Sequence, residues 1–115
     1  MIGRFRGRAS FERVARTGSR VRAGVLWCTF VLDPHVSPPE VAYAIGRAVG
    51  PAVTRNRVRR RLRALVAARA AALPGGLFLF GVAPDTASRS YSELAFDMER
   101  LLEKLRASRP ASTGA

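Results

Sequence analysis

Hydrophobic residues near the start of the chain recur with the spacing of a short helix. Ser10 is a suitable N-cap, and Phe11 and Val14 then fall on one helical face. Gly18 can end such an element as a left-handed residue. The pattern therefore predicts a helix over residues 10–17.

The next segments alternate with the period of a β-strand. Residues 23–32 contain too many β-branched and aromatic side chains for a comfortable helix and predict a strand. The more apolar face of this strand is formed by Leu26, Cys28, Phe30 and Leu32. The opposite face is mixed and can meet solvent or ligand; it is formed by Val25, Trp27, Thr29 and Val31. Residues 40–46 alternate large and small side chains, which also suits a strand. Residues 76–83 are apolar throughout, as expected of a central strand.

Two longer segments have helical periodicity. Thr54 can cap the first, Pro74 ends it, and its apolar positions are Val58, Leu62, Leu65, Val66 and Leu73. Ser90 and Glu93 have capping-box spacing ahead of the second, whose apolar positions are Leu94, Met98, Leu101, Leu102 and Leu105. The predicted order of helix, two or three strands, helix, strand and helix describes an α/β two-layer sandwich. We expect one domain over residues 1–107 and a disordered polar tail over residues 108–115.

The net charge of the chain indicates the chemical class of its binding partner. The 115 residues carry 20 basic and 8 acidic side chains, a net charge of +12. Eight of the basic residues and none of the acids lie within residues 41–84. Such a field attracts polyanions, and nucleic acid is the leading partner. A membrane is disfavoured, because no apolar run approaches the roughly 20 residues needed to span it.

The basic residues are densest on the helix that follows Thr54. Six arginines and one asparagine lie within nine residues there: Arg55, Asn56, Arg57, Arg59, Arg60, Arg61 and Arg63. Like charges at this spacing repel one another, and phosphates are the natural compensating groups. The alternative is a basic face that is only solvated. Asn56 is either an accessory to the helix N-terminus or a ligand for phosphate, ribose or a hydrated metal ion.

Side chains suited to protein-based catalysis are scarce. Cys28 is the only cysteine and His35 the only histidine, which leaves no zinc-ligand spacing and fits a reducing cytoplasm. A protein nuclease needs carboxylates that hold a metal ion, or a histidine base, near the basic surface. Residues 41–84 contain neither. We therefore expect that the polypeptide does not cut RNA by itself.

The segment AVGPAVTRNRVRRRLR, residues 48–63, resembles the signature of the bacterial ribonuclease P protein family, an Arg-Asn-Arg helix preceded by Gly-x-Ala-Val. The likeness extends over residues 4–106. It includes Phe5, the helix with Phe11, the apolar strand, and the leucine-rich last helix with Tyr91. Hallmark, element order, length and charge together make the resemblance specific.

The resemblance implies a fold and a function. The fold has αβββαβα order, a four-stranded sheet and ribosomal protein S5 domain 2-like topology, with a left-handed βαβ crossover where right-handed ones are otherwise nearly universal. The function is that of the protein subunit of ribonuclease P, an endoribonuclease that removes the 5′ leader of precursor tRNA in the cytoplasm. In that family the RNA subunit carries the chemistry with Mg²⁺, which is bound mainly by the RNA. No obligate protein partner is expected.

The resemblance also implies two RNA-binding surfaces. The surface for the catalytic RNA comprises Arg47, Arg55, Asn56, Arg57, Arg59, Arg60 and Arg63. A cleft between the first helix and the sheet takes the single-stranded leader and is lined by Phe11 and Trp27, because aromatic side chains stack on any base. Core packing is the alternative for both aromatic residues. The chain departs from the family in two places, since Ala15 replaces a second aromatic residue and Arg47 alone stands where the family has paired lysines.

One rival comes from a different functional class. A small ribosomal-protein-like structural RNA binder shares the size, the charge and the basic helix but has no enzymatic role. A helix-turn-helix DNA binder is a weaker rival, because strand-like segments flank the basic helix. Ribonuclease P RNA and precursor tRNA are therefore the expected partners.

Overall fold

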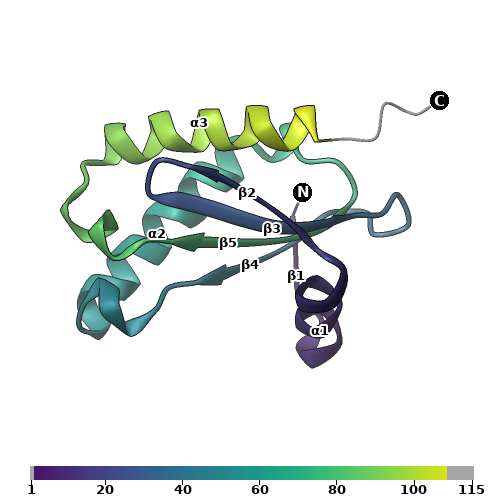
Figure 1. The fold of residues 1–115 in the computed structure, drawn as a ribbon, viewed down its shortest axis with the longest axis horizontal. Helices are drawn as coiled ribbons and strands as arrows, with labels where there is room; N and C mark the ends of the chain where they lie inside the picture. The colour runs from purple at the N-terminus through teal and green to yellow at the C-terminus, as the bar shows by residue number, and fades with distance from the viewer. Residues whose placement is uncertain (1, 109–115) are drawn as a thin grey trace.

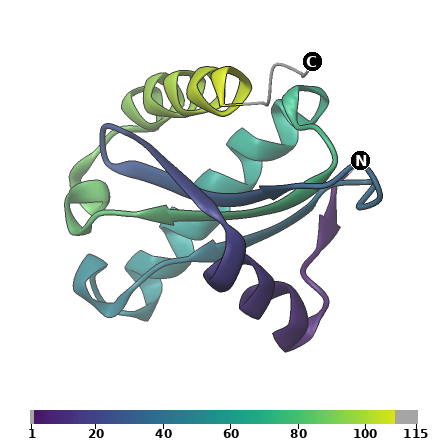
Figure 2. The same ribbon diagram turned by 45° about the vertical axis from the view of Figure 1, so that its right-hand side comes forward.

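A five-stranded mixed sheet organises the computed structural model, which describes residues 2–108 (Figure 1). The elements in chain order are β1 (Gly3–Arg4), α1 (Gly7–Thr17), β2 (Ser19–Ala23), β3 (Leu26–Leu32), β4 (Glu40–Ala44), η1 (Arg47–Val49), α2 (Ala52–Ala68), η2 (Ala70–Ala72), β5 (Gly76–Val82), η3 (Pro84–Ser88) and α3 (Tyr91–Ala107). Helices α2 and α3 pack on one face of the sheet and α1 on the other, and Figure 2 shows α1 and α3 on opposite sides. This arrangement confirms the predicted α/β sandwich.

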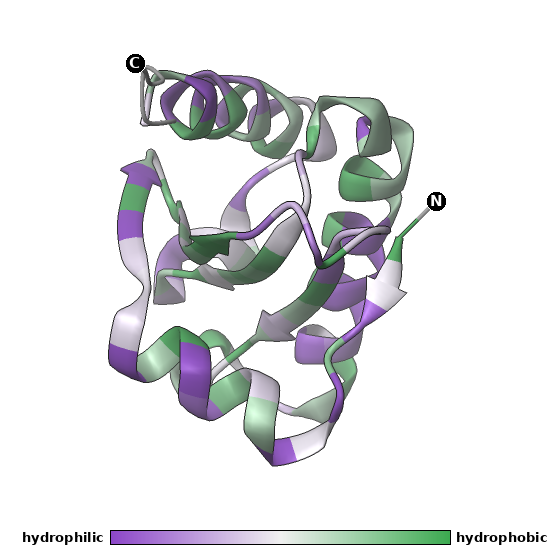
Figure 3. Ribbon diagram, turned by 90° about the vertical axis from the view of Figure 1, so that its right-hand side faces the viewer, coloured by the Kyte–Doolittle hydropathy of each residue, from purple (hydrophilic) through white to green (hydrophobic). Residues whose placement is uncertain are grey.

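The main core lies between the sheet and the two long helices. The strand side chains Cys28, Phe30, Phe78 and Phe80 point inward and are buried. They meet the apolar stripes of α2 and α3, in which Leu62 and Leu94 are fully buried. Both helices alternate hydrophobic and hydrophilic residues along the ribbon (Figure 3). Each large apolar side chain buried here stabilises the fold by about 1.5–3 kcal/mol.

The sheet has one strand more than the family resemblance implies. The additional strand β1 has only two residues and pairs in parallel with the start of β4 at the sheet edge. The strand predicted over residues 23–32 is also wrong at its beginning. Residues 19–23 form β2, and Gly24 reverses the chain with a φ of +59°, a conformation that glycine adopts without strain. The result is a hairpin in which β2 and β3 pair antiparallel.

The crossover connection between β4 and β5 is left-handed, which is uncommon. These strands are parallel neighbours in the sheet order β1-β4-β5-β3-β2, and α2 connects them. In Figure 1 both strands point to the left, β5 lies above β4, and α2 passes behind the sheet, which makes the connection left-handed. The chain therefore has the expected αβββαβα order from α1 onward.

The first two helices begin earlier than predicted. Helix α1 starts at Gly7, and Ser10 is buried inside it, where its hydroxyl accepts the backbone N–H of Arg6 at 3.0 Å. Ser10 thus provides an acceptor for a backbone N–H at the start of α1, although it lies within the first turn of the helix. Gly18 ends α1 in an extended conformation, with φ −76° and ψ 153°, and not in the left-handed one.

Helix α2 also differs from the prediction at both ends. It starts directly after Pro51, whose fixed φ suits the start of a helix, so that Thr54 lies within its first turn. It ends at Ala68 rather than near Pro74. Leu73 is buried as predicted, but it follows the short η2 segment.

The predicted capping box of α3 is confirmed. The Glu93 backbone N–H donates to the Ser90 hydroxyl at 3.1 Å, and the Ser90 backbone N–H donates to the Glu93 carboxylate at 2.8 Å. The second bond contributes to a Glu93 pKa below its usual value. The predicted tail of residues 108–115 lies outside the described residues except for Ser108, which closes α3.

Removal of this cap should lower stability without changing the RNA-binding surfaces. We expect Ser90→Ala to reduce the free energy of unfolding by about 1 kcal/mol, because the N–H of Glu93 loses its acceptor. Urea denaturation measures the change, and Ser88→Ala, at the end of η3, is the matched control. Equal stabilities of S90A and S88A would contradict a stabilising role for the box.

Candidate nucleic-acid interface

The arginine side chains of α2 form a surface on the side of the helix opposite its buried residues. Asn56, Arg57, Arg60 and Arg63 are exposed, whereas Arg55, Arg59 and Arg61 are partly covered. The three ion pairs within residues 2–108 join Arg6 to Glu40, Arg13 to Asp33 and Arg69 to Glu99, and therefore lie elsewhere. Residues 55–63 thus present several positive charges that no carboxylate in the described part of the chain neutralises.

Hydrogen bonds to neutral acceptors orient part of this surface. Arg55 donates through Nε to the Gly50 carbonyl at 3.1 Å, and Arg61 donates to the Arg89 carbonyl at 3.3 Å. These bonds restrict the two side chains and leave their charge uncompensated. Arg63 lies 6.0 Å from the centre of the Tyr43 ring, at the outer limit of a cation–π contact.

Asn56 lies in the second turn of α2 and does not cap the helix. Its Oδ1 accepts a hydrogen bond from Arg59 at 2.8 Å, and no side chain caps the N-terminus of α2. Its interpretation as an N-terminal accessory is therefore wrong. The Asn56 amide group lies exposed between arginines, where its N–H groups can donate to an RNA oxygen.

The loop before α2 carries the remaining residue predicted for this surface. Arg47 is exposed at the start of η1, which packs against α2. Gly50 joins the two elements with a φ of +148°, and a Cβ at this position would approach Thr54 to 3.2 Å. Glycine therefore allows η1 to turn directly into α2, so that Arg47 and the arginines of α2 belong to one region of the fold.

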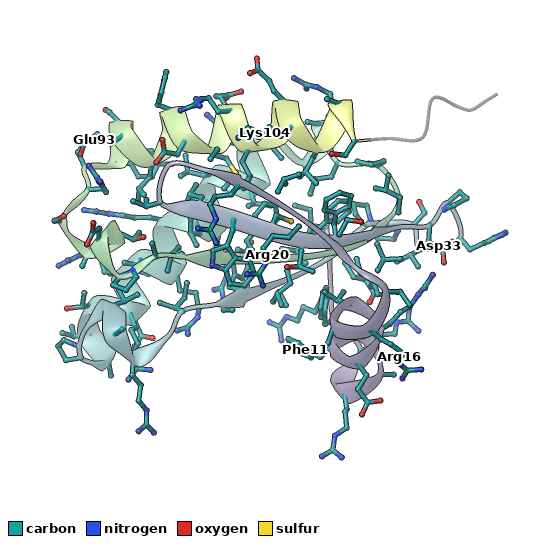
Figure 4. The ribbon with its side chains drawn as sticks, viewed as in Figure 1. Phe11, Arg16, Arg20, Asp33, Glu93 and Lys104 are labelled. Carbon is teal, nitrogen blue, oxygen red and sulfur yellow. The ribbon has the colours of Figure 1, made fainter. Side chains whose placement is uncertain are left out.

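A second surface lies on the face of the sheet that α1 covers only in part. By strand register, Trp27, Thr29, Leu79 and Gly81 share this face, and we call these four residues the α1 face. Phe11 of α1 is 45% exposed and packs edge-on against Phe5, with ring centroids 4.9 Å apart. Figure 4 shows Phe11 beneath the sheet on the inner side of α1, whereas Arg16 points to the outer side. Core packing is therefore the wrong description of Phe11.

Trp27 is half-buried on the α1 face, near the hairpin end of β3. A Cβ at Gly81 would overlap the indole, so glycine is what allows Trp27 to lie directly on β5. The guanidinium of Arg20 lies over the indole, with its central carbon 4.0 Å from the ring centroid. Arg20 also donates through Nε to the Thr29 hydroxyl at 2.9 Å. Trp27 is thus in contact with both β5 and an arginine.

The sequence analysis missed Arg20. The signal was the hairpin, because in the register of β2 and β3 Arg20 pairs with Thr29 and is the diagonal neighbour of Trp27. With no element predicted for residues 19–22, this pairing was not visible. A strand assigned to residues 19–23 would have placed Arg20 on the mixed face together with Trp27.

Two nucleophilic side chains near these surfaces are held in their neutral forms. Burial raises the pKa of the Tyr43 phenol above its usual value, although the nearby Arg63 opposes the shift. Burial also strongly raises the pKa of the Cys28 thiol. At neutral pH both groups therefore remain protonated and uncharged.

Residues 2–108 contain neither a cluster of potential metal ligands nor a helix able to cross a membrane. His, Cys, Asp and Glu residues there form no group of three or more that is able to hold a metal ion. None of the described helices combines the length and the apolar character that a bilayer crossing requires.

Comparisons with known proteins agree on one family. Residues 3–106 match the family model described as Ribonuclease P. The chain is 38% identical to the ribonuclease P protein component of Acidothermus cellulolyticus, over 89% of this chain and 87% of that protein. It is 41% identical to the ribonuclease P protein component of a Nocardioides species, over 86% of this chain and 87% of that protein.

Solved structures show the same fold. The RNase P protein of Staphylococcus aureus superimposes with a TM-score of 0.82 at 14% identity, and 90% of this chain and 94% of that chain are covered. The RNase P protein of Thermotoga maritima gives a TM-score of 0.77 at 16% identity, with coverage of 88% and 96%. At these identities the likeness concerns the fold alone. It includes the mixed sheet and the three α-helices of this chain.

Proposed function

The chain belongs to the family of bacterial ribonuclease P protein components, and we propose that it binds the catalytic RNA and the 5′ leader of precursor tRNA and so assists removal of the leader. The observation that carries this proposal is the arginine surface of α2. Within a chain of this family, it is the largest group of charges that lacks carboxylate partners in residues 2–108. Phosphates of a structured RNA supply the missing negative charge.

The contact with the catalytic RNA involves both the loop and the helix. Its residues are Arg47, Arg55, Asn56, Arg57, Arg59, Arg60 and Arg63. The exposed guanidinium groups bind phosphates through paired N–H donors, and the Asn56 amide donates to a ribose or phosphate oxygen. The hydrogen bonds of Arg55 and Arg59 to Gly50 and Asn56 support this role, since they restrict two side chains before RNA arrives.

The leader binds in the cleft between α1 and the sheet. Phe11 lines it from the helix and Trp27 from β3. Exposure of Phe11 and its orientation in Figure 4 support the first assignment. Because Ala15 replaces the second aromatic residue of the family, this chain relies more on the sheet side of the cleft.

The RNA subunit carries the chemistry in this proposal. The chain is the non-catalytic protein subunit of an endoribonuclease, and Mg²⁺ is held mainly by the RNA. The side chains of the α2 surface support this division of roles, because guanidinium and amide groups offer hydrogen-bond donors to RNA and not a general base. The site of action is the cytoplasm, and the chain needs no obligate protein partner.

The protein alone should therefore leave precursor tRNA uncut. We expect no mature 5′ ends when the purified chain is incubated with precursor tRNA and Mg²⁺ without ribonuclease P RNA. Primer extension or gel analysis of end-labelled tRNA measures this. Specific 5′ maturation that persists through repeated purification would contradict the assignment of the chemistry to the RNA.

The ribosomal-protein-like alternative predicts a different preference among RNAs. A structural ribosomal binder should prefer ribosomal RNA, whereas the proposed subunit should bind ribonuclease P RNA more tightly at equal salt concentration. The comparisons favour the ribonuclease P family and give the ribosomal alternative no support.

A further inference from the structure

We infer that Arg20, and not Trp27 itself, is the surface on which a base of the leader stacks. The inference rests on the proposed function and adds a residue to its leader cleft. It begins with the contacts among Gly81, Trp27 and Arg20, which we call the Arg20 stack. In this stack the indole lies against Gly81 of β5, and the guanidinium of Arg20 lies over the ring.

Two contacts restrain the guanidinium of Arg20. Its centre lies 4.0 Å from the centroid of the Trp27 ring, the distance of a close cation–π contact. Its Nε donates to the Thr29 hydroxyl at 2.9 Å. One contact holds the group against the ring and the other stops it from rotating away. Arg20 therefore offers its outer face as a flat, preorganised platform, and preorganisation lowers the entropy lost on binding.

The outer side of Arg20 is open to a ligand. Arg20 is exposed, and no hydrogen bond or ion pair within residues 2–108 engages its Nη groups. A pocket of about 300 Å³ continues from Trp27 toward Arg22 and Pro84 at the end of the hairpin. A single strand that crosses the cleft thus finds a planar cation with a recess next to it.

The chemistry of this platform fits an unpaired base. Single-stranded RNA is recognised by stacking of splayed bases on aromatic rings or on arginine planes. A guanidinium also attracts the neighbouring phosphate through its free N–H groups. A lysine at position 20 keeps the charge but has no plane to stack and no Nε to bond Thr29. Arg20→Lys therefore separates stacking from simple charge attraction.

The test uses the holoenzyme, formed by the full chain with ribonuclease P RNA. Affinities are measured for precursor tRNA and for mature tRNA without a leader, with wild type, R20K and the control R16K. Arg16 is exposed on α1 and points away from the cleft (Figure 4). Stacking on one base is worth roughly 5- to 150-fold in affinity. We expect R20K to lose a preference of this size for the precursor, and R16K to keep it.

A second readout reports on the stack itself. Trp27 is the only tryptophan, so its fluorescence comes from this site alone. If Arg20 stays on the indole, precursor binding should leave the emission of the wild-type holoenzyme close to that with mature tRNA. A strong quench by the leader would mean that a base has displaced Arg20 and stacks on Trp27 directly, which overturns the inference.

The outcomes also separate this inference from the proposed function. A wild-type holoenzyme with no preference for the precursor would overturn both. A wild-type preference that R20K retains would overturn the role of Arg20 alone, because charge would then suffice. Equal losses of R20K on both tRNAs would likewise remove Arg20 from the leader site.

Discussion

Raising the salt concentration from 50 to 200 mM should weaken binding of the chain to ribonuclease P RNA by about 50- to 1800-fold. The expectation follows from about 4–6 phosphate contacts on the α2 surface, each of which contributes roughly −0.7 to −0.9 to the slope of log affinity against log salt. The arginines concerned have no carboxylate partner within residues 2–108, so their charge is available to phosphates. Filter binding or fluorescence anisotropy over this range gives the slope.

Substitutions then locate the contacts. The double variant Arg57→Ala with Arg60→Ala should reduce the magnitude of the slope by about 1.4–1.8, because two phosphate contacts are lost. Arg100→Ala on α3 is the matched control, since Arg100 is also exposed but lies next to Phe96, away from α2. A salt-independent affinity, or equal slopes for the double variant and wild type, would mean that the basic face of α2 is only solvated.

Trp27→Ala should weaken binding of precursor tRNA to the holoenzyme by roughly 5- to 150-fold and leave binding of mature tRNA unchanged. The indole supports Arg20 from below, so its removal leaves the guanidinium without its stacking partner. Arg20 then keeps only its bond to Thr29 and is less restrained. Equilibrium binding of the two tRNAs, with wild type measured alongside, gives the selectivity.

Folding has to be controlled in this experiment, because Trp27 also packs on Gly81. Thermal unfolding of the free protein measures that contribution. Phe96→Ala, which removes an aromatic side chain that is 63% exposed on α3, is the matched variant and should not alter selectivity. Equal losses of W27A on both tRNAs, or losses that follow the drop in melting temperature, would show that Trp27 only stabilises the sheet.

The parts of the fold that depend on local contacts could be predicted from the sequence. The capping box of Ser90 and Glu93 involves residues three apart, and the apolar stripe of α3 repeats along one helix. The apolar strand at residues 76–83 was recognisable because its neighbours β3 and β4 cover both edges and the helices cover its faces. Each of these patterns arises from residues close together in the sequence, so the sequence alone is enough to recognise it.

Features that depend on distant contacts could not be predicted in this way. The two-residue strand β1 exists only because β4 offers it a free edge. Helix α1 begins at Gly7 partly because the Ser10 hydroxyl, which serves its first turn, also donates to Glu40, 30 positions away. The hand of the crossover followed only from the family resemblance, since the order of elements does not determine it.

The candidate site also has one part that local sequence predicts and one part that depends on distant contacts. The six arginines at residues 55–63 lie within nine residues of one helix, so helical periodicity was enough to place them on one surface. The Arg20 stack joins β2, β3 and β5, and it became visible only with the hairpin turn at Gly24 and the register of three strands. A residue that acts through strand pairing is found only after the pairing is known.

The central claim is that this chain assists a catalytic RNA in removing the leader of precursor tRNA. The most direct test measures the rate of 5′ maturation of precursor tRNA by ribonuclease P RNA at a fixed, low Mg²⁺ concentration, with and without the folded chain. The chain should accelerate cleavage at the mature 5′ end and lower the substrate concentration needed. An unchanged rate and an unchanged substrate requirement, with the chain folded and bound to the RNA, would contradict it.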